Sequence, residues 1–70
     1  MTLSTILRTQ KSQRRLSVLK MAVMTDISEP QISNLLTGRN TNPSIRTLGK
    51  IAAGLGLDLG DVCRAAAGQA

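Results

Sequence analysis

The chain has 70 residues, a net charge of +5 and no phenylalanine, tyrosine, tryptophan or histidine. A chain of this length forms one small domain, and its single cysteine excludes an internal disulfide and a cysteine–histidine zinc site. Stability must therefore come from close helix packing or from dimerisation. The missing aromatic side chains argue against modules that stack unpaired bases, and the missing histidine leaves no catalytic constellation. We expect a chain that is not an enzyme and that uses no metal or cofactor.

The positive charge is unevenly distributed along the chain. Residues 1–50 carry eight basic side chains against Asp26 and Glu29, whereas residues 51–70 carry one, Arg64, against two acidic ones. The excess in the first part predicts contact with a polyanion there, although a charge that serves only solubility is the alternative. No apolar stretch reaches the roughly 18 residues of a membrane span, and no signal peptide is evident. A lone thiol suits the reduced cytoplasm.

Apolar side chains recur with helical spacing in five segments, so we expect an all-α domain. The first helix is expected from residue 2 to about 13, with Thr2 or Ser4 as its cap. The others are expected at 16–24, 28–37, 45 to about 55 and 58–64, with caps at Ser17, Ser28, Ser44 and Asp58. Residues 65–70 are expected to form a short disordered tail, which puts the domain at residues 1–64.

The segment 25–38 has the local chemistry of a tight turn followed by a helix. Asp26 tolerates the left-handed backbone that such a turn needs, and Ile27 is expected to fill the angle between the two helices. Ser28 and Gln31 have the spacing of a Ser-x-x-Gln capping box, and the glycine at the end of the segment closes the helix. The sequence therefore predicts a helix–turn–helix unit.

The third helix has an apolar side and a polar side. Ile32, Leu35 and Leu36 follow helical spacing and are expected to face the core. The outward side is uncharged at its centre and consists of groups that can hydrogen-bond base edges, although a plain solvated face is the alternative. These outward side chains are Glu29, Gln31, Ser33 and Asn34.

Donors for phosphate oxygens flank this helix. Arg39, Asn40 and Thr41 follow it and can bind phosphate through side chains or backbone N–H groups. Lys20 lies in the first turn of the second helix, where the helix dipole disfavours a cation. A nearby phosphate would remove that conflict, and simple exposure of Lys20 explains its position equally well.

The remaining helices have apolar stripes. In the fourth helix the stripe consists of Ile45, Leu48, Ile51, Ala52 and Leu55. Gly49 lies within that helix and is expected to allow close packing against a neighbouring helix. The apolar positions of the fifth helix are Leu57, Leu59, Val62 and Cys63. The second helix carries more apolar surface than two turns need, in Val18, Leu19, Val23 and Met24, so part of it is either covered by the first helix or exposed.

Taken in order, these residues resemble the helix-turn-helix of the Cro and lambda-repressor-like (Xre-type) family. The matching positions are Leu16, Ser17, Met21, Ala22, Thr25, Ile27, Ser28, Ile32, Ser33, Leu35 and Gly38. The resemblance continues through Pro43, Leu48, Ile51, Ala52, Leu55, Gly56 and Leu59 and covers about residues 3–63. It implies a compact five-helix domain with the helix-turn-helix at its second and third helices.

The resemblance also implies a function and a set of DNA contacts. The chain would be a sequence-specific regulator that binds double-stranded DNA, as small phage- or plasmid-type repressors do. The third helix would lie in the major groove and the second across the backbone. The base-reading residues would be Glu29, Pro30, Gln31, Ser33 and Asn34. Contacts to the DNA backbone would come from Ser17, Ser28, Thr37, Arg39, Asn40, Thr41 and Arg46, with Lys20 as a further candidate.

The chain departs from the family pattern at three places. Val18 stands where the family usually has a glutamine that reaches a phosphate, and Leu36 stands where a glutamate often pairs with an arginine of the first helix. The junction between the first two helices is about three residues longer than usual and is basic. We therefore expect Arg14 and Arg15, together with Lys11, to replace the lost phosphate contact.

Repressors of this kind usually bind a near-palindromic operator as a two-fold dimer. The candidate dimer surface is the fifth helix, through Leu59, Val62 and Cys63, and we expect a weak homodimer that DNA strengthens. The alternative function is an antitoxin-like or other protein-interaction module on the same fold, which would use the surplus apolar residues of the second helix.

Overall fold

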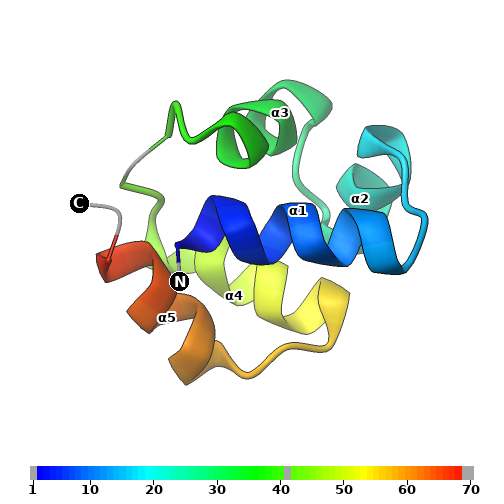
Figure 1. Ribbon diagram of the computed structural model, residues 1–70. Coiled ribbons are helices and arrows are strands. Elements are labelled where there is room, and N and C mark those ends of the chain that lie inside the picture. Colours follow the sequence, from blue (N-terminus) through cyan, green and yellow to red (C-terminus); the bar gives the residue numbers. More distant parts are fainter. Residues whose placement is uncertain (1, 41, 69–70) are drawn as a thin grey trace.

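The computed structural model describes residues 2–40 and 42–68 of the chain. Five helices make up the described part, which contains no strand, and they form a compact globule (Figure 1). The helices are α1 (Leu3–Gln13), α2 (Val18–Thr25), α3 (Glu29–Thr37), α4 (Ile45–Leu55) and α5 (Leu59–Ala67). The all-α prediction and the expected order of elements are confirmed. None of the helices in the described residues is both long and apolar enough to cross a membrane.

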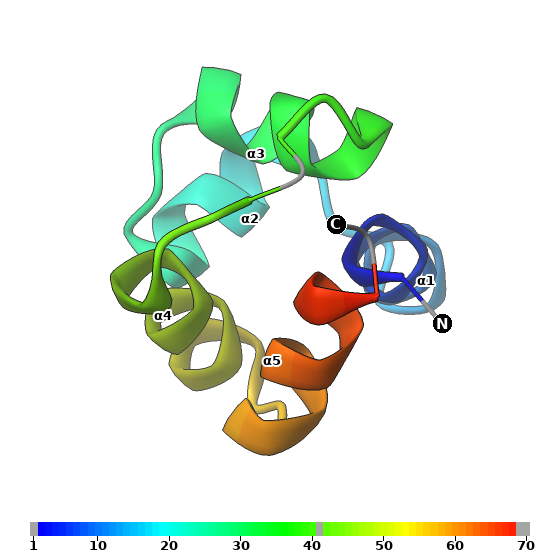
Figure 2. The same cartoon turned by 90° about the vertical axis from the view of Figure 1, so that its left-hand side faces the viewer.

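The helices pack around one aliphatic core. In Figure 1 the α1 helix lies between α3 above and α4 and α5 below, and Figure 2 shows that it lies along one side of the molecule. The α2 helix packs on α3 and α4, whereas α1 packs on α3 and α5. The side chains with almost no exposed surface are Leu3, Leu7, Met21, Ile32, Leu35, Ile51 and Val62. Every helix contributes to this set, so no pair of helices has a separate core.

Each helix begins with a side-chain cap. The capping oxygen accepts a hydrogen bond from the backbone N–H three residues later, which satisfies one of the unpaired donors of the first turn. The caps are Thr2, Ser17, Ser28, Ser44 and Asp58. The predicted caps are confirmed, and α1 uses Thr2 because Ser4 lies inside the helix and is buried.

Three helices end in the same way. A residue with positive φ lies one or two positions after the helix. The apolar residue that comes next donates its N–H to a carbonyl oxygen five positions earlier. The positive-φ residues are Arg15, Asp26 and Gly56, and the apolar ones are Leu16, Ile27 and Leu57. The left-handed backbone expected at the turn is thus found at Asp26, where φ is 58°. Because all three apolar residues pack on the core, each ending also fixes the direction of the next segment.

Two expectations for α4 are wrong. Ile45 is 68% exposed and is the first residue of the helix, so the apolar stripe that packs on the core begins one turn later, at Leu48. Apart from the adjacent backbone of its own helix, a Cβ atom placed on Gly49 would meet no heavy atom of the described residues within 4 Å, so this glycine allows no close approach. The close approach occurs instead at Gly54, where a Cβ atom would collide with the carbonyl oxygen of Met24. The end of α2 therefore rests directly on the backbone of α4.

The fifth helix is longer than expected. Residues 65–67 continue α5 as far as Ala67, and Ala65 and Ala66 are buried, so the expected disordered tail is wrong for these residues. Alanine has the highest helix propensity and little apolar surface, so a run of alanines gives a weak periodic signal even where it packs. Gln69 and Ala70 lie outside the described residues.

Candidate nucleic-acid interface

Hydrogen bonds within the first turn of α3 fix the start of this helix. The Ser28 hydroxyl accepts from the Gln31 backbone N–H at 3.4 Å and donates to Gln31 Oε1 at 3.1 Å. Gln31 Oε1 also accepts from the Ser28 backbone N–H at 3.4 Å, which completes the predicted capping box. Ile32, Leu35 and Leu36 are buried as expected. The opposite side of α3 therefore points to solvent in a fixed orientation.

All five predicted base-reading side chains are exposed: Glu29, Pro30, Gln31, Ser33 and Asn34. Within the described part of the chain, the side chains of Ser33 and Asn34 make no hydrogen bond, so their polar groups can meet a ligand. Pro30 and Asn34 are four residues apart and lie on the side opposite to the core. Asn34 thus presents a free amide at the centre of the exposed face, where it can pair with adenine in a bidentate manner.

The capping box changes what Gln31 can do. Bidentate pairing with adenine needs both the carbonyl oxygen and the amino group of the side chain. The Gln31 oxygen already accepts from Ser28, so only the amino group is available while the box is intact. Gln31 can therefore act as a donor to a base acceptor, whereas Asn34 is the amide that can use both of its groups.

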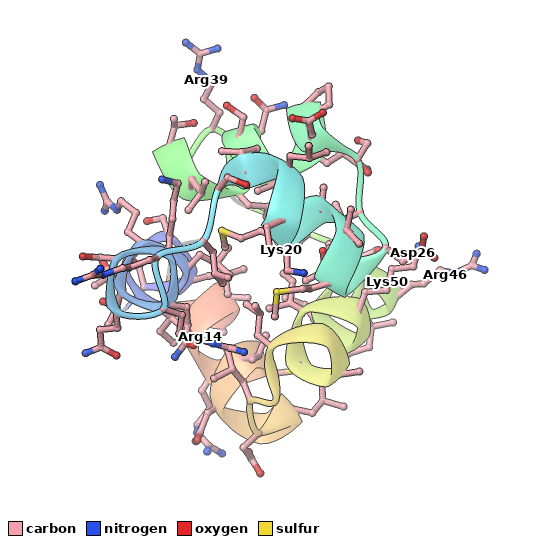
Figure 3. The ribbon with its side chains drawn as sticks, turned by 90° about the vertical axis from the view of Figure 1, so that its right-hand side faces the viewer. Arg14, Lys20, Asp26, Arg39, Arg46 and Lys50 are labelled. Atoms are coloured by element: carbon pink, nitrogen blue, oxygen red, sulfur yellow. The ribbon has the colours of Figure 1, made fainter. Side chains whose placement is uncertain are left out.

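The start of α2 offers a second set of polar groups. Ser17 is exposed, and its hydroxyl oxygen accepts from the Lys20 backbone N–H at 3.0 Å, which leaves its hydrogen available for a phosphate. The Lys20 side chain is exposed and has no partner among the described residues (Figure 3). Val18 is half-buried against the core and offers no polar group in place of the family's glutamine. The first turn of α2 can thus bind a phosphate only through Ser17, Lys20 and its backbone N–H groups.

The loop after α3 is anchored to that helix. The Asn40 backbone N–H donates to the Asn34 carbonyl oxygen at 3.2 Å, and Asn40 Oδ1 accepts from the Asn42 backbone N–H at 3.2 Å. The amino group of Asn40 remains available. Arg39 and Arg46 both extend from the surface into solvent (Figure 3). Thr41, also a predicted phosphate contact, lies outside the described residues.

Two predicted hydroxyl contacts are already engaged within the protein. Thr37 Oγ1 donates to the Ser33 carbonyl oxygen at 3.0 Å and lies 3.3 Å from that of Asn34, so its hydrogen is not free for a phosphate. The Ser28 hydroxyl both donates and accepts within the capping box. Contact with DNA through either hydroxyl would require these bonds to be exchanged.

The structure assigns Arg14 a different task from the predicted one. Its Nη1 atom donates to the Leu55 carbonyl oxygen at 3.0 Å, and Gln10 Oε1 lies 3.4 Å away. The guanidinium thus caps the C-terminal end of α4, where helix carbonyls lack partners and the dipole favours a cation. In Figure 3 Arg14 lies far from Arg39 and the α3 face. Arg15, in contrast, is exposed and unpaired in the described structure.

The basic side chains fall into two groups. Arg14, Lys50 and Arg64 are engaged within the protein: Arg14 at Leu55, Lys50 at Asp26 and Arg64 at Asp61. The others have no hydrogen bond or ion pair within residues 2–40 and 42–68. These are Arg8, Lys11, Arg15, Lys20, Arg39 and Arg46, and all lie in the first 46 residues. The unpaired charge is therefore confined to the part of the chain that contains α2 and α3.

The predicted dimer surface is smaller than expected. Val62 is only 1% exposed, because α5 turns it toward the core of its own chain, so it offers no surface to a second chain. Cys63 is partly buried against the core. Leu59 is 46% exposed and is the main apolar side chain that α5 presents to solvent among the described residues.

A family model described as "Cro/C1-type HTH DNA-binding domain" matches residues 2–67. The chain belongs to this family. The resemblance seen in the sequence is thereby confirmed, as is the helix-turn-helix fold. Searches among curated proteins and among solved structures gave no match. The described residues contain no group of three or more histidine, cysteine, aspartate or glutamate side chains that could hold a metal ion.

Two residues of this Cro/C1-type domain were missed by sequence reasoning. Gly54 lets α2 rest on α4, and Lys50 reaches the turn between α2 and α3. Gly54 lies two residues before a second glycine, Gly56, so in the sequence it resembles part of a helix end and not a packing position. An exposed lysine on a helix carries no sequence signal for a backbone partner 24 residues away.

Proposed function

We propose that the chain is a transcriptional regulator that binds double-stranded DNA in a sequence-specific way. In this proposal α3 lies in the major groove, and the N-terminal end of α2 and the loop after α3 contact phosphates on either side. The protein acts in the cytoplasm as a small repressor of the phage or plasmid type, by covering a promoter. Base reading would fall to Glu29, Pro30, Gln31, Ser33 and Asn34.

One observation carries this proposal: α3 is fixed at its first turn and presents an exposed face with unpaired polar groups. A helix that serves only as support can also expose polar side chains, so the unpaired cations near this face are part of the support for the proposal. Here the centre of the face holds Asn34 and Ser33, whose hydrogen-bonding groups are unused. The unpaired cations lie in the same part of the chain and supply the attraction to phosphate that base contacts need.

We also propose that two copies bind a near-palindromic operator. One domain of this size covers about one half-site, and two-fold related domains place their recognition helices about 34 Å apart, or one turn of DNA. Leu59 and the exposed edge of Cys63 would form the contact between the copies. This contact is small, so the homodimer is weak in solution and is strengthened on DNA.

The proposal is tested by selecting duplexes from a random pool and measuring binding to the selected sequence. Asn34→Ala should weaken binding to the selected duplex by about 10- to 100-fold, because it removes a bidentate base contact. Binding to unrelated DNA should stay unchanged, because Asn34 makes no phosphate contact in this proposal. Arg64→Gln on α5 is the matched control, and it should leave both affinities as in the wild type.

If the selection yields no preferred sequence, or if Asn34→Ala weakens binding to all duplexes equally, the proposal is wrong. Binding to all sequences with similar affinity would point to a DNA-packing role. The shift assay should be run at two salt concentrations, because the phosphate contribution changes steeply with salt and the base contribution does not.

A second candidate function, protein binding, is supported by one observation. Leu19 and Val23 lie one turn apart on α2 and are 57% and 68% exposed, whereas Met24 is partly buried against the core. An antitoxin-like partner would cover this pair. Replacing both with glutamine should abolish such an interaction and leave DNA selection unchanged, which two-hybrid and shift assays together would measure.

A further inference from the structure

We propose that Lys50 is a positioning residue that sets the angle of α3 and thereby the sequence selectivity of this domain. The inference rests on the proposed DNA-binding function. Lys50 lies on α4, outside the helix-turn-helix, and its Nζ atom donates to the Asp26 carbonyl oxygen at 3.1 Å. Asp26 is the residue at which the chain turns from α2 into α3.

The backbone bond is the part of this contact that matters. Nζ also lies 3.8 Å from Asp26 Oδ2, but the Asp26 side chain is 96% exposed. An ion pair so open to water contributes little. The carbonyl oxygen, in contrast, belongs to the end of α2, where no helical N–H is available to it and where the helix dipole favours a cation. Lys50 therefore holds the backbone of the turn.

A second contact from α4 acts on the same place. Gly54 is four residues after Lys50, so both lie on one side of α4. The backbone of Met24 and Thr25 rests on Gly54, where no Cβ atom could be accommodated. The end of α2 is thus pressed against α4 at Gly54, and the following turn is held by Lys50. Figure 3 shows Lys50 beside Asp26 at this end of the molecule.

This arrangement matters because α4 has few direct contacts with α3 among the described residues. The main packing partners of α3 are α1 and α2, whereas α4 packs mainly on α2 and α5. The position of α3 relative to α4 is therefore set through α1, through α2 and through the turn that follows α2. Release of the Asp26 carbonyl would let the turn relax and would tilt the α3 face.

A tilt of α3 affects the two kinds of DNA contact differently. Flexible lysine and arginine side chains can follow a phosphate, so backbone contacts survive small movements. Bidentate base contacts need hydrogen-bond geometry at two atoms at once and are lost with a small displacement. Lys50 should thus influence selectivity between sequences more strongly than it influences affinity for DNA in general.

The test compares Lys50→Met with Arg46→Met, which removes the same charge one turn earlier on the same helix. Lys50→Met should lower the ratio of specific to non-specific affinity about 10-fold, the value of one base contact, with an unchanged slope of affinity against salt. Arg46→Met should keep the ratio and lower the slope by about 1, as expected for a lost phosphate contact. Lys50→Arg should restore the ratio, because a guanidinium can still donate to the carbonyl.

Two controls separate positioning from stability and from the ion pair. Ile51→Val destabilises the core without removing the Lys50 amino group, and at a temperature where it is folded it should keep the wild-type ratio. Asp26→Asn removes the ion pair but keeps a residue that tolerates left-handed backbone, and it should also keep the ratio. A loss of selectivity in either control would overturn the assignment to the backbone bond.

A measurement on the free protein distinguishes failure of this inference from failure of the proposed function. Residual dipolar couplings report the angle between α3 and α4, and this angle should change in Lys50→Met but not in Arg46→Met. Three results in Lys50→Met would each overturn the positioning role. They are unchanged couplings, an unchanged selectivity ratio, and a salt slope that is reduced by about 1. A wild-type protein without sequence preference would refute the proposed function, and the selectivity role of Lys50 with it.

Discussion

Arg14 and Arg15 are neighbours in the chain and have opposite roles. Arg14 is bound to the last carbonyl of α4, whereas Arg15 occupies a left-handed backbone position with φ of 53° and extends into solvent. Such a backbone costs a residue with a Cβ atom about 1 kcal/mol relative to glycine. An arginine at this position therefore has to be explained by its side chain, and an unpaired guanidinium next to the start of α2 is suited to a phosphate.

We predict different effects of replacing these two arginines by glutamine. Arg15→Gln should lower the slope of log affinity against log salt by about 1 and leave stability unchanged, because glutamine pays the same backbone cost. Arg14→Gln should keep the slope and reduce the free energy of unfolding by about 1 kcal/mol, through loss of the bond to Leu55. Titrations at several salt concentrations and urea unfolding measure the two quantities. An equal change of slope in both variants would show that Arg14 leaves α4 when DNA binds.

At the scale of helices, α2 and α4 meet backbone to backbone at Gly54. The backbone of Met24 and Thr25 lies directly on Gly54, without a side chain between the two helices. Gly49, five residues earlier on α4, faces open space. The same residue type thus has a packing role at one position and only an entropic cost at the other.

We predict that the two glycines respond to alanine in opposite directions. Gly54→Ala should reduce the free energy of unfolding by about 2 kcal/mol or more, because its Cβ atom would collide with backbone that cannot move aside cheaply. Gly49→Ala should increase it by up to about 1 kcal/mol, since alanine favours the helix and meets no neighbour. Thermal and urea unfolding of both variants provide the measurement. Destabilisation by Gly49→Ala would contradict the open environment found at that position.

Local chemistry explains which parts of the helices could be predicted. The caps at Ser17, Ser28, Ser44 and Asp58 and the left-handed Asp26 depend on a few neighbouring residues, and the sequence contains those residues. The role of Gly54 could not be predicted, because it depends on the position of the end of α2 in space. That end is about 30 residues away in the sequence. Ile45 was misplaced for a related reason: helical spacing gives the side of a helix but not where a neighbouring helix ends.

At the scale of the whole molecule, the core takes up most of the apolar surface of α5. Val62, Ala65 and Ala66 are buried, so the helix that was expected to mediate dimerisation mainly completes the single chain. Sequence pattern shows that Val62 is apolar but cannot show whether its neighbour belongs to the same chain or to a second one. The hydrogen bond of Arg14 could not be predicted either, because its partner Leu55 lies 41 residues away in the sequence.

We predict that Leu59 controls assembly of two chains on DNA. Sedimentation should show mostly monomer for the free protein at micromolar concentration and two chains on a near-palindromic duplex. Leu59→Asp should abolish joint binding of the two chains and leave binding to a single half-site unchanged, because Leu59 is remote from the α3 face. A wild-type protein that stays monomeric on the palindromic duplex would contradict the proposed dimer.

The inward orientation of Val62 has a consequence for regulation. With little surface left for self-association, two chains would meet mainly on the operator, and occupancy would rise with the square of the protein concentration. Under this proposal a modest fall in the amount of protein frees the promoter abruptly, without a ligand or a cleavage step. By leaving little surface for dimerisation in solution, the buried Val62 would help to make promoter occupancy respond to the protein concentration itself.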